Sequence, residues 1–360
     1  MLAAGGKVAI QLGSVENWPT RAEDLPKGRF ALTKVQLIFA GTKPKQPVEN
    51  LESLAGLDYL ASIETDGLLL QDENLAPLTS VPQLASLRMN KAALTDGAID
   101  YVLAMKALVD FRPVACKGFA GTRLGELART KISSISLMGC QLVPEAFPAL
   151  RRLTALNYLA LNFTNTTDAD LALLADLKNL DTLYVSHPIT LQALTDLKRL
   201  QKLHTFGWTL TPGRAVEEIA AIHRIFPDLR NFELNPPPGE QRVWQEAEFA
   251  AFEMFANIAN MRTSGSAFGD EAARGVLNLK NLALVQTKGS SLTDTGLATL
   301  AEHKALEHIT VESADVTDAG LLKLISAKSL RSVTVRNCPK ITAAGLAAFQ
   351  RARPDVAAKR

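Results

Sequence analysis

The chain has 360 residues, of which 47% are hydrophobic and 21% are charged, and its formal net charge at pH 7 is +2. This composition excludes an intrinsically disordered chain, because enough apolar side chains are present to bury a large core. A charge so close to zero offers no concentrated basic face, so we expect no nucleic-acid partner. No apolar run approaches the about 20 residues that span a bilayer, so no membrane insertion is expected.

Residues 1–31 are predicted to form an N-terminal cap. Val8, Ile10 and Leu12 alternate as they would in a strand, and a polar, proline-containing segment follows them. The first twelve residues contain one lysine and no adequate apolar stretch, so no secretory signal is predicted. A cytoplasmic location is therefore expected.

An apolar pattern of the form LxxLxL recurs from residue 32 onward. Its first residue, the lead, recurs every 24 positions at Leu84, Leu108, Ile132, Leu156 and Leu180. Elsewhere the leads are 20 to 29 positions apart, at Leu32, Leu60, Leu200, Leu229, Ile258, Leu279, Leu306 and Leu330. We therefore predict about 13 repeats over residues 32–349, irregular at 200–280, where two longer helices are expected at 211–226 and 240–258. Residues 350–360 are predicted to be a C-terminal tail.

Aspartates form a second column in phase with the first. Asp72, Asp96, Asp168, Asp270 and Asp318 each follow a lead by 12 positions. Thr-Asp phrases such as VTDAGLLKL at 316–324 are typical of helix starts, because these side chains accept hydrogen bonds from free backbone N–H groups. Regularly spaced carboxylates could instead share calcium ions. Capping explains the same residues without a metal, so neither a metal nor another cofactor is predicted.

Cysteines form a third column, since Cys116, Cys140 and Cys338 each follow a lead by 8 positions. With these columns the chain resembles a leucine-rich repeat protein with 24-residue, helix-containing repeats, and TDAGL resembles the leucine-rich regions of large bacterial proteins. The resemblance implies an α/β solenoid, a ribonuclease-inhibitor-like horseshoe with parallel strands on its concave face and helices on its convex face.

Stacked strands would place the backbones of Cys116 and Cys140 about 5 Å apart, which is within the range for a disulfide. Side chains directed into the turn need not have the required torsion, however. Cysteine in such a column also behaves as a small buried hydrophobe. Free, buried thiols are therefore the interpretation we favour.

The concave face is the predicted binding surface. Positions 4 and 6 of LxxLxL enter the core, whereas positions 3, 5 and 7 face outward. The binding residues expected on this face are Tyr158, Tyr184, His187, His204, Phe206, Trp208, Arg88 and Arg112. An exposed aromatic patch is typical of a partner site. The alternative is that several of these aromatic residues turn inward to fill space in the short repeat that begins at Leu180.

No catalytic residues are predicted. The sequence contains no phosphate loop, GxSxG elbow, HExxH helix or CxxC pair. The predicted function is a non-enzymatic interaction module that binds a protein or peptide on the concave face. The alternative function is a regulatory or sensory region of a larger bacterial multidomain enzyme such as a kinase.

Overall fold

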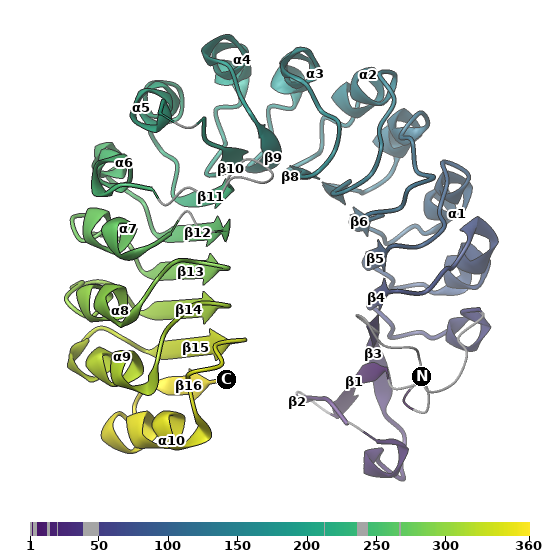
Figure 1. Ribbon diagram of the computed structural model, residues 1–360. Helices are drawn as coiled ribbons and strands as arrows, with labels where there is room; N and C mark the ends of the chain where they lie inside the picture. The colour runs from purple at the N-terminus through teal and green to yellow at the C-terminus, as the bar shows by residue number, and fades with distance from the viewer. Residues whose placement is uncertain are drawn as a thin grey trace. The chain divides into compact units, whose positions relative to one another are not determined.

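The computed structural model describes residues 2, 6–12, 15–19, 21–38, 50–211, 213–235, 244–265 and 268–360. They divide into two compact units, Met1–Asp181 (unit 1) and Thr182–Arg360 (unit 2). In both units strands alternate with helices along the chain, and the helices lie on one face of the sheet (Figure 1). Within the described ranges, no helix is both long and apolar enough to cross a membrane.

Unit 1 begins with an antiparallel arrangement and continues as a parallel sheet. Its strands are β1 (Lys7–Leu12), β2 (Val15–Asn17), β3 (Ala31–Ile38), β4 (Ser62–Asp66), β5 (Ser86–Asn90), β6 (Asp110–Arg112), β7 (Ser134–Ser136) and β8 (Tyr158–Leu161). Its helices are η2 (Ala22–Asp24), η3 (Glu52–Leu54), η4 (Asp72–Ser80), α1 (Ala98–Ala104), η5 (Leu124–Arg129), α2 (Ala146–Arg151), α3 (Asp168–Leu173) and η6 (Leu174–Asp176). Strand β1 pairs antiparallel with both β2 and β3, and the strands from β3 to β8 pair in parallel.

All described strand pairs within unit 2 are parallel. The strands are β9 (Thr182–Pro188), β10 (Thr205–Thr209), β11 (Asn231–Asn235), β12 (Asn260–Ser264), β13 (Leu284–Lys288), β14 (His308–Glu312), β15 (Ser332–Arg336) and β16 (Ala357–Lys359). The helices are α4 (Leu191–Asp196), η7 (Leu197–Arg199), α5 (Ala215–Ile225), α6 (Glu246–Ala250), η8 (Ala251–Met254), α7 (Asp270–Gly275), α8 (Asp294–Leu300), α9 (Asp318–Lys323), η10 (Leu324–Ser326) and α10 (Ala343–Ala352).

The LxxLxL pattern produces this fold by filling the space between each sheet and its helices. In β5, Leu87 and Met89 at positions 4 and 6 are fully buried, and Leu159 and Leu161 repeat the arrangement in β8. Each such side chain contributes about 1.5–3 kcal/mol through burial. A single repeat cannot cover this apolar surface by itself, so successive repeats stack. The chain is therefore a leucine-rich repeat solenoid with parallel strands and helices, and the predicted fold class is confirmed.

Four aspartates of the column, Asp72, Asp96, Asp270 and Asp318, and a further one, Asp294, each join their repeat to the next. The backbone N–H and the hydroxyl of Thr317 donate to the two carboxylate oxygens of Asp294 at 2.7 and 2.6 Å. Thr342 binds Asp318 in the same way at 2.8 and 2.7 Å. Equivalent pairs join Thr95 to Asp72 and Thr293 to Asp270. Thr122 donates both of its hydrogen bonds to Oδ2 of Asp96. We call this set of contacts the Asp–Thr ladder.

The threonine, rather than the aspartate, caps the helix of its own repeat. The hydroxyl oxygen of Thr317 accepts a hydrogen bond from the N–H of Ala319 at 3.1 Å while its proton is donated to Asp294. Capping by the aspartate, as we expected from the sequence, is thus only half correct, because its carboxylate turns toward the following repeat. The hydrogen bonds from Thr342 also hold the pKa of Asp318 below its usual value.

Glycine leaves the space that these carboxylates occupy. A Cβ atom at Gly320 would collide with Asp294, and one at Gly345 would collide with Asp318. Both glycines lie in the first turn of a helix, where alanine would otherwise be the more stable residue by about 1 kcal/mol. The glycine of the TDxGL phrase therefore follows from close approach of the preceding repeat.

The ends of the chain differ from the repeats. At the C-terminal end α10 stops at Ala352, and residues 350–360, predicted as a tail, also contain strand β16. The guanidinium of Arg353 donates to the carbonyl oxygens of Ala327 at 2.8 Å and Leu330 at 3.2 Å.

The irregular region at 200–280 contains the two longer helices that we expected. Helix α5 lies within the helix expected at 211–226. The helix expected at 240–258 is represented by α6 and η8, with residues 240–243 outside the described part.

The residue after each outward-facing position 7 adopts a left-handed backbone conformation in nine repeats. The residues with positive φ at this position are Gly67, Lys91, Ala115, Gly139, Phe163, Gly265, Gly289, Ser313 and Asn337. They are spaced 24 residues apart within each unit. The N–H of Gly289 donates to the carbonyl of Glu312 in the next repeat at 2.7 Å. The column was not recognised in the sequence because only four of its nine residues are glycine.

We expect Gly289→Ala to lower the free energy of unfolding by about 1–2 kcal/mol, which is the cost of a Cβ in the left-handed region. The nearest atom to that Cβ would be 3.8 Å away, so steric overlap adds nothing. Gly28→Ala is the matched control, since its Cβ meets nothing within 4 Å and its φ is not positive. Equal denaturant midpoints for the two variants would contradict the conformational explanation.

Candidate functional site

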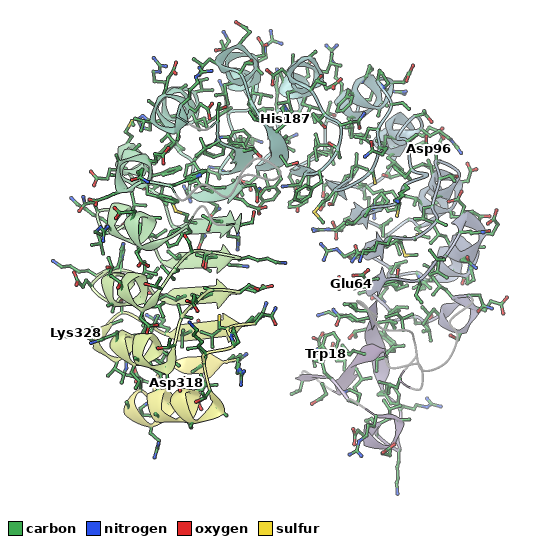
Figure 2. The ribbon with its side chains drawn as sticks, viewed as in Figure 1. Trp18, Glu64, Asp96, His187, Asp318 and Lys328 are labelled. Carbon is green, nitrogen blue, oxygen red and sulfur yellow. The ribbon has the colours of Figure 1, made fainter. Side chains whose placement is uncertain are left out.

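The face of each sheet opposite its helices, here called the strand face, presents positions 3 and 5 of successive strands. Strand register defines the position 5 rows as Gln36, Glu64, Arg88, Arg112, Ser136 and Ala160 in unit 1, and as Tyr184, Gly207, Glu233, Arg262, Gln286, Thr310 and Thr334 in unit 2. Figure 2 shows Glu64 on the strand face and Asp96 on the side of the helices. Most members of the rows are half-buried and polar.

A hydrogen-bonded network centred on Asp110 organises the strand face of unit 1. Its carboxylate accepts hydrogen bonds from Ser86 at 2.8 Å, from Ser134 at 2.5 Å and from Nε of Arg112 at 2.8 Å. These three donors come from β5, β7 and β6 itself, so the network crosses three neighbouring strands. We did not recognise Asp110 in the sequence, although Ser86, Asp110 and Ser134 form a column at position 3.

Arg112 is fixed by this network and by an aromatic ring. Its guanidinium carbon lies 4.7 Å from the ring centroid of Tyr158, the position 3 residue of β8. Burial alone would lower the pKa of Arg112, but its hydrogen bond and charge interaction with Asp110 raise that pKa above its usual value. Two of the predicted binding residues, Arg112 and Tyr158, therefore contact each other on the strand face.

Arg88 lies beside Arg112 in the same row, because the two residues are in register on β5 and β6. Its Nη1 donates to Oε1 of Glu64 at 3.2 Å, and the other oxygen of Glu64 accepts from the side-chain amide of Gln36 at 3.1 Å. The side chain of Arg88 is 37% exposed and that of Arg112 is 23% exposed, so both remain accessible.

In unit 2, the ring of Tyr184 lies next to a glycine. A Cβ at Gly207 would collide with the ring of Tyr184, and it would lie 3.1 Å from the Cβ of Glu233. Absence of a side chain at position 5 of β10 thus allows the tyrosine to lie against the backbone of its neighbour. Burial raises the pKa of Glu233, although the nearby side chain of Asn235 and the charge of Arg262 oppose this shift.

Phe206 and Trp208, which we expected on the binding face, are core residues. Phe206 is in register with Leu183, and the two aromatic side chains are 0% and 1% exposed. Their rings stack with centroids 5.1 Å apart. The error came from taking Leu200 as the lead. Leu203 is the lead of this repeat, and the aromatic residues then occupy positions 4 and 6, where they fill the volume of two leucines.

The same change of lead displaces His204 from position 5, where Gly207 lies. His204 is half-buried immediately before β10, and its carbonyl accepts from the N–H groups of Arg230 and Asn231. His187 is half-buried near the end of β9, beyond the core positions of that strand. Neither histidine lies in the position 5 row.

The three cysteines are free and buried, as predicted. The thiol of Cys140 donates to the carbonyl of Pro113 at 2.8 Å, and that of Cys116 donates to the carbonyl of Met89 at 3.2 Å. Burial raises the pKa of Cys116 to about 12 and that of Cys140 to about 11. Thiols with such pKa values are protonated and unreactive at neutral pH.

Comparisons with known proteins find distant structural similarity. No family model and no curated protein matches the chain. An internalin (InlF) from Listeria monocytogenes has 15% sequence identity and a TM-score of 0.44, over 84% of this chain and 86% of that chain. The structure of the TLR13–ssRNA13 complex has 13% identity and a TM-score of 0.46, over 85% of this chain and 45% of that chain. Similarity this low supports no inference about partner or activity.

We expect Phe206→Ala to lower the free energy of unfolding by about 3–5 kcal/mol, because a fully buried ring would leave a cavity. Tyr184→Ala should cost much less, since the half-buried ring lies on the strand face and its loss opens no enclosed cavity. Denaturant unfolding of the two variants tests the assignment. Closely similar midpoints would contradict the placement of Phe206 in the core and Tyr184 on the face.

Proposed function

We propose that the chain is a non-enzymatic recognition module whose strand face binds a protein or peptide. Arginine and tyrosine are the residue types that most often dominate binding energy in protein interfaces. The strand face carries both types in accessible positions, as Arg88, Arg112 and Tyr158 in unit 1 and as Tyr184 and Arg262 in unit 2.

The observation that carries this proposal is the immobilisation of Arg112. Asp110 holds one edge of its guanidinium and the ring of Tyr158 lies against it, so the side chain is ordered before any partner arrives. Ordering a long side chain on binding usually costs about 0.5–1.5 kcal/mol, and a preorganised side chain avoids that cost.

A protein partner fits the charge pattern better than a nucleic acid does. Glu64, Asp66 and Asp110 lie among the arginines of unit 1, so its strand face lacks the concentrated positive charge that phosphate backbones require. The exclusion of nucleic acid nevertheless stays a prediction, and the following experiment tests it.

We expect photo-crosslinking from the strand face to capture a protein. Gln286 would be replaced by a photo-reactive phenylalanine derivative, and Lys328, which is exposed on the helical side (Figure 2), would be replaced as the control. A protease-sensitive adduct should form with the derivative at position 286 and not at 328. Equal adducts at both positions, or an adduct removed by nuclease, would contradict the proposal.

The captured partner would then be used to measure affinities. Tyr158→Ala should weaken binding by about 1–3 kcal/mol, as expected for an aromatic residue at the centre of an interface. Tyr59→Ala is the control, because Tyr59 is 60% exposed but lies in a turn outside the strands.

A further inference from the structure

We propose that His303 is a pH-sensitive link between two successive repeats of unit 2, which holds while its ring is neutral and is lost when the ring gains a proton. The inference is independent of the proposed function, because it concerns the turns that follow helices α7 and α8 and not the strand face. It assigns a regulatory role to a side chain that recognition of a partner does not use.

The ring of His303 is enclosed between the two repeats. The residue lies in the turn after α8 and is 4% exposed. Together with the buried Phe255 and Leu279 it lines a groove of about 1030 Å³, which is formed by the turns that follow η8, α7 and α8. A polar ring at this depth is stable only if its nitrogens have hydrogen-bond partners.

Two backbone groups determine which ring nitrogen carries the proton. The N–H of Ala305 donates to Nδ1 of His303 at 3.2 Å, so Nδ1 has no proton of its own. The proton of the neutral ring is therefore on Nε2, which donates to the carbonyl oxygen of Leu279 at 3.2 Å. The neutral ring thus connects the turn before β14 to the turn before β13.

Protonation is incompatible with this arrangement. An imidazolium donates from both nitrogens, so a proton on Nδ1 would point at the N–H of Ala305, and that N–H would lose its acceptor. Burial also lowers the pKa of His303, and contacts with the backbone of Leu279 and Val276 only partly oppose this shift. Geometry and burial therefore favour the neutral ring in the folded protein.

The charged groups that surround the ring are balanced. The groove is lined by two acidic and two basic side chains, Glu253, Lys280, Glu302 and Lys304. On the following repeat, Ser329 donates to the carbonyl of His303 at 3.3 Å, and the adjacent Lys328 is exposed on the helical side (Figure 2). His223 borders the groove through Phe255, with ring centroids 4.9 Å apart. Burial, rather than one neighbouring charge, therefore sets the direction of the pKa shift of His303.

The same groove offers the imidazolium another position. In the ranges that the structure describes, the carboxylates of Glu253 and Glu302 have no ion-pair partner. A protonated ring that leaves Leu279 and Ala305 can approach either carboxylate, and an opposite charge favours the protonated form. The side chain thus has one position for each protonation state.

Stability should fall on acidification. Because the pKa of His303 in the folded chain lies below the about 6.5 of an unfolded chain, the unfolded chain takes up the proton first. The stabilisation is complete above about pH 6.5 and is lost as the pH decreases from there toward the folded-state pKa. This is the range in which histidines act as pH switches.

NMR and hydrogen exchange of the full chain test the link. At about pH 7.5 the imidazole nitrogen signals of His303 should show a proton on Nε2 only, and their titration midpoint should lie below about 6.5. Between about pH 7.5 and about pH 5, the protection of the Ala305 N–H, corrected for intrinsic exchange, should fall at least about tenfold because a hydrogen bond is lost. The N–H of Ala259, which donates to the carbonyl of Arg230 at 2.8 Å, should keep its protection.

His303→Gln and His223→Gln form a matched pair of variants. Glutamine can donate and accept as the neutral imidazole does, but it does not titrate in this range. Protection of the Ala305 N–H should therefore become independent of pH in His303→Gln. His223→Gln replaces the other histidine that borders the groove and should leave the tenfold fall unchanged. Should His303→Gln fail to fold, the proton position and titration midpoint of the unmodified chain decide.

Four results would overturn the inference: a proton on Nδ1 at about pH 7.5, a midpoint at or above about 6.5, pH-independent protection of Ala305 in the unmodified chain, or an equal fall in His303→Gln. None of them bears on the crosslinking of a protein to the strand face at neutral pH. The proposed function and the pH-sensitive link therefore stand or fail separately.

Discussion

Where it is present, the Asp–Thr ladder links the start of one helix to the start of the next. A carboxylate at the start of one repeat receives both the backbone N–H and the hydroxyl of the threonine that begins the following helix, as Asp294 does from Thr317. The same threonine oxygen caps its own helix. One aspartate therefore sets the spacing between helices, and it satisfies an N–H group that the helix itself leaves unpaired.

A regular strand register accompanies that spacing, although β10, β11 and β12 also pair without shifts across longer repeats. Where the ladder is present, as between Asp270 and Thr342, the repeats are 24 residues long and neighbouring strands pair without shifts. Side chains at equivalent positions then form straight rows across the sheet. The rows allow Asp110 to accept hydrogen bonds from three strands and allow Arg88 to lie directly beside Arg112. The regular rows thus position the side chains of the strand face.

Much of this architecture is predictable from the sequence, because a period of 24 specifies the core. Leu87, Leu159 and Leu183 are buried as the LxxLxL pattern requires. The prediction failed where two leucines competed for one position. Leu200 and Leu203 both fit as one lead, and Leu279 and Leu282 both fit as another. Strand pairing shows that Leu203 and Leu282 are the leads, and that Phe206 and Trp208 replace leucines in the core.

The candidate site was predicted in part, since Arg88, Arg112 and Tyr158 were recognised and Asp110 was not. A sequence identifies outward positions by alternation, but it does not specify which of them share hydrogen bonds across strands.

Long-range contacts also explain why residues 207 and 320 are glycines. Each glycine makes room for a side chain about 23 to 26 residues away, Tyr184 in one case and Asp294 in the other, and local propensity gives no sign of this.

A double-mutant cycle at Asp294 and Gly320 tests the central role of the ladder most directly. Gly320→Ala should destabilise the unmodified protein, because the new methyl group would collide with the carboxylate of Asp294. In the Asp294→Ala background the same substitution should cost clearly less, because the carboxylate is gone and only the contact with the backbone Cα of residue 294, at 2.9 Å, remains. The account predicts a coupling energy of about 1–3 kcal/mol between the two sites, measured by denaturant unfolding. Additive effects would contradict it.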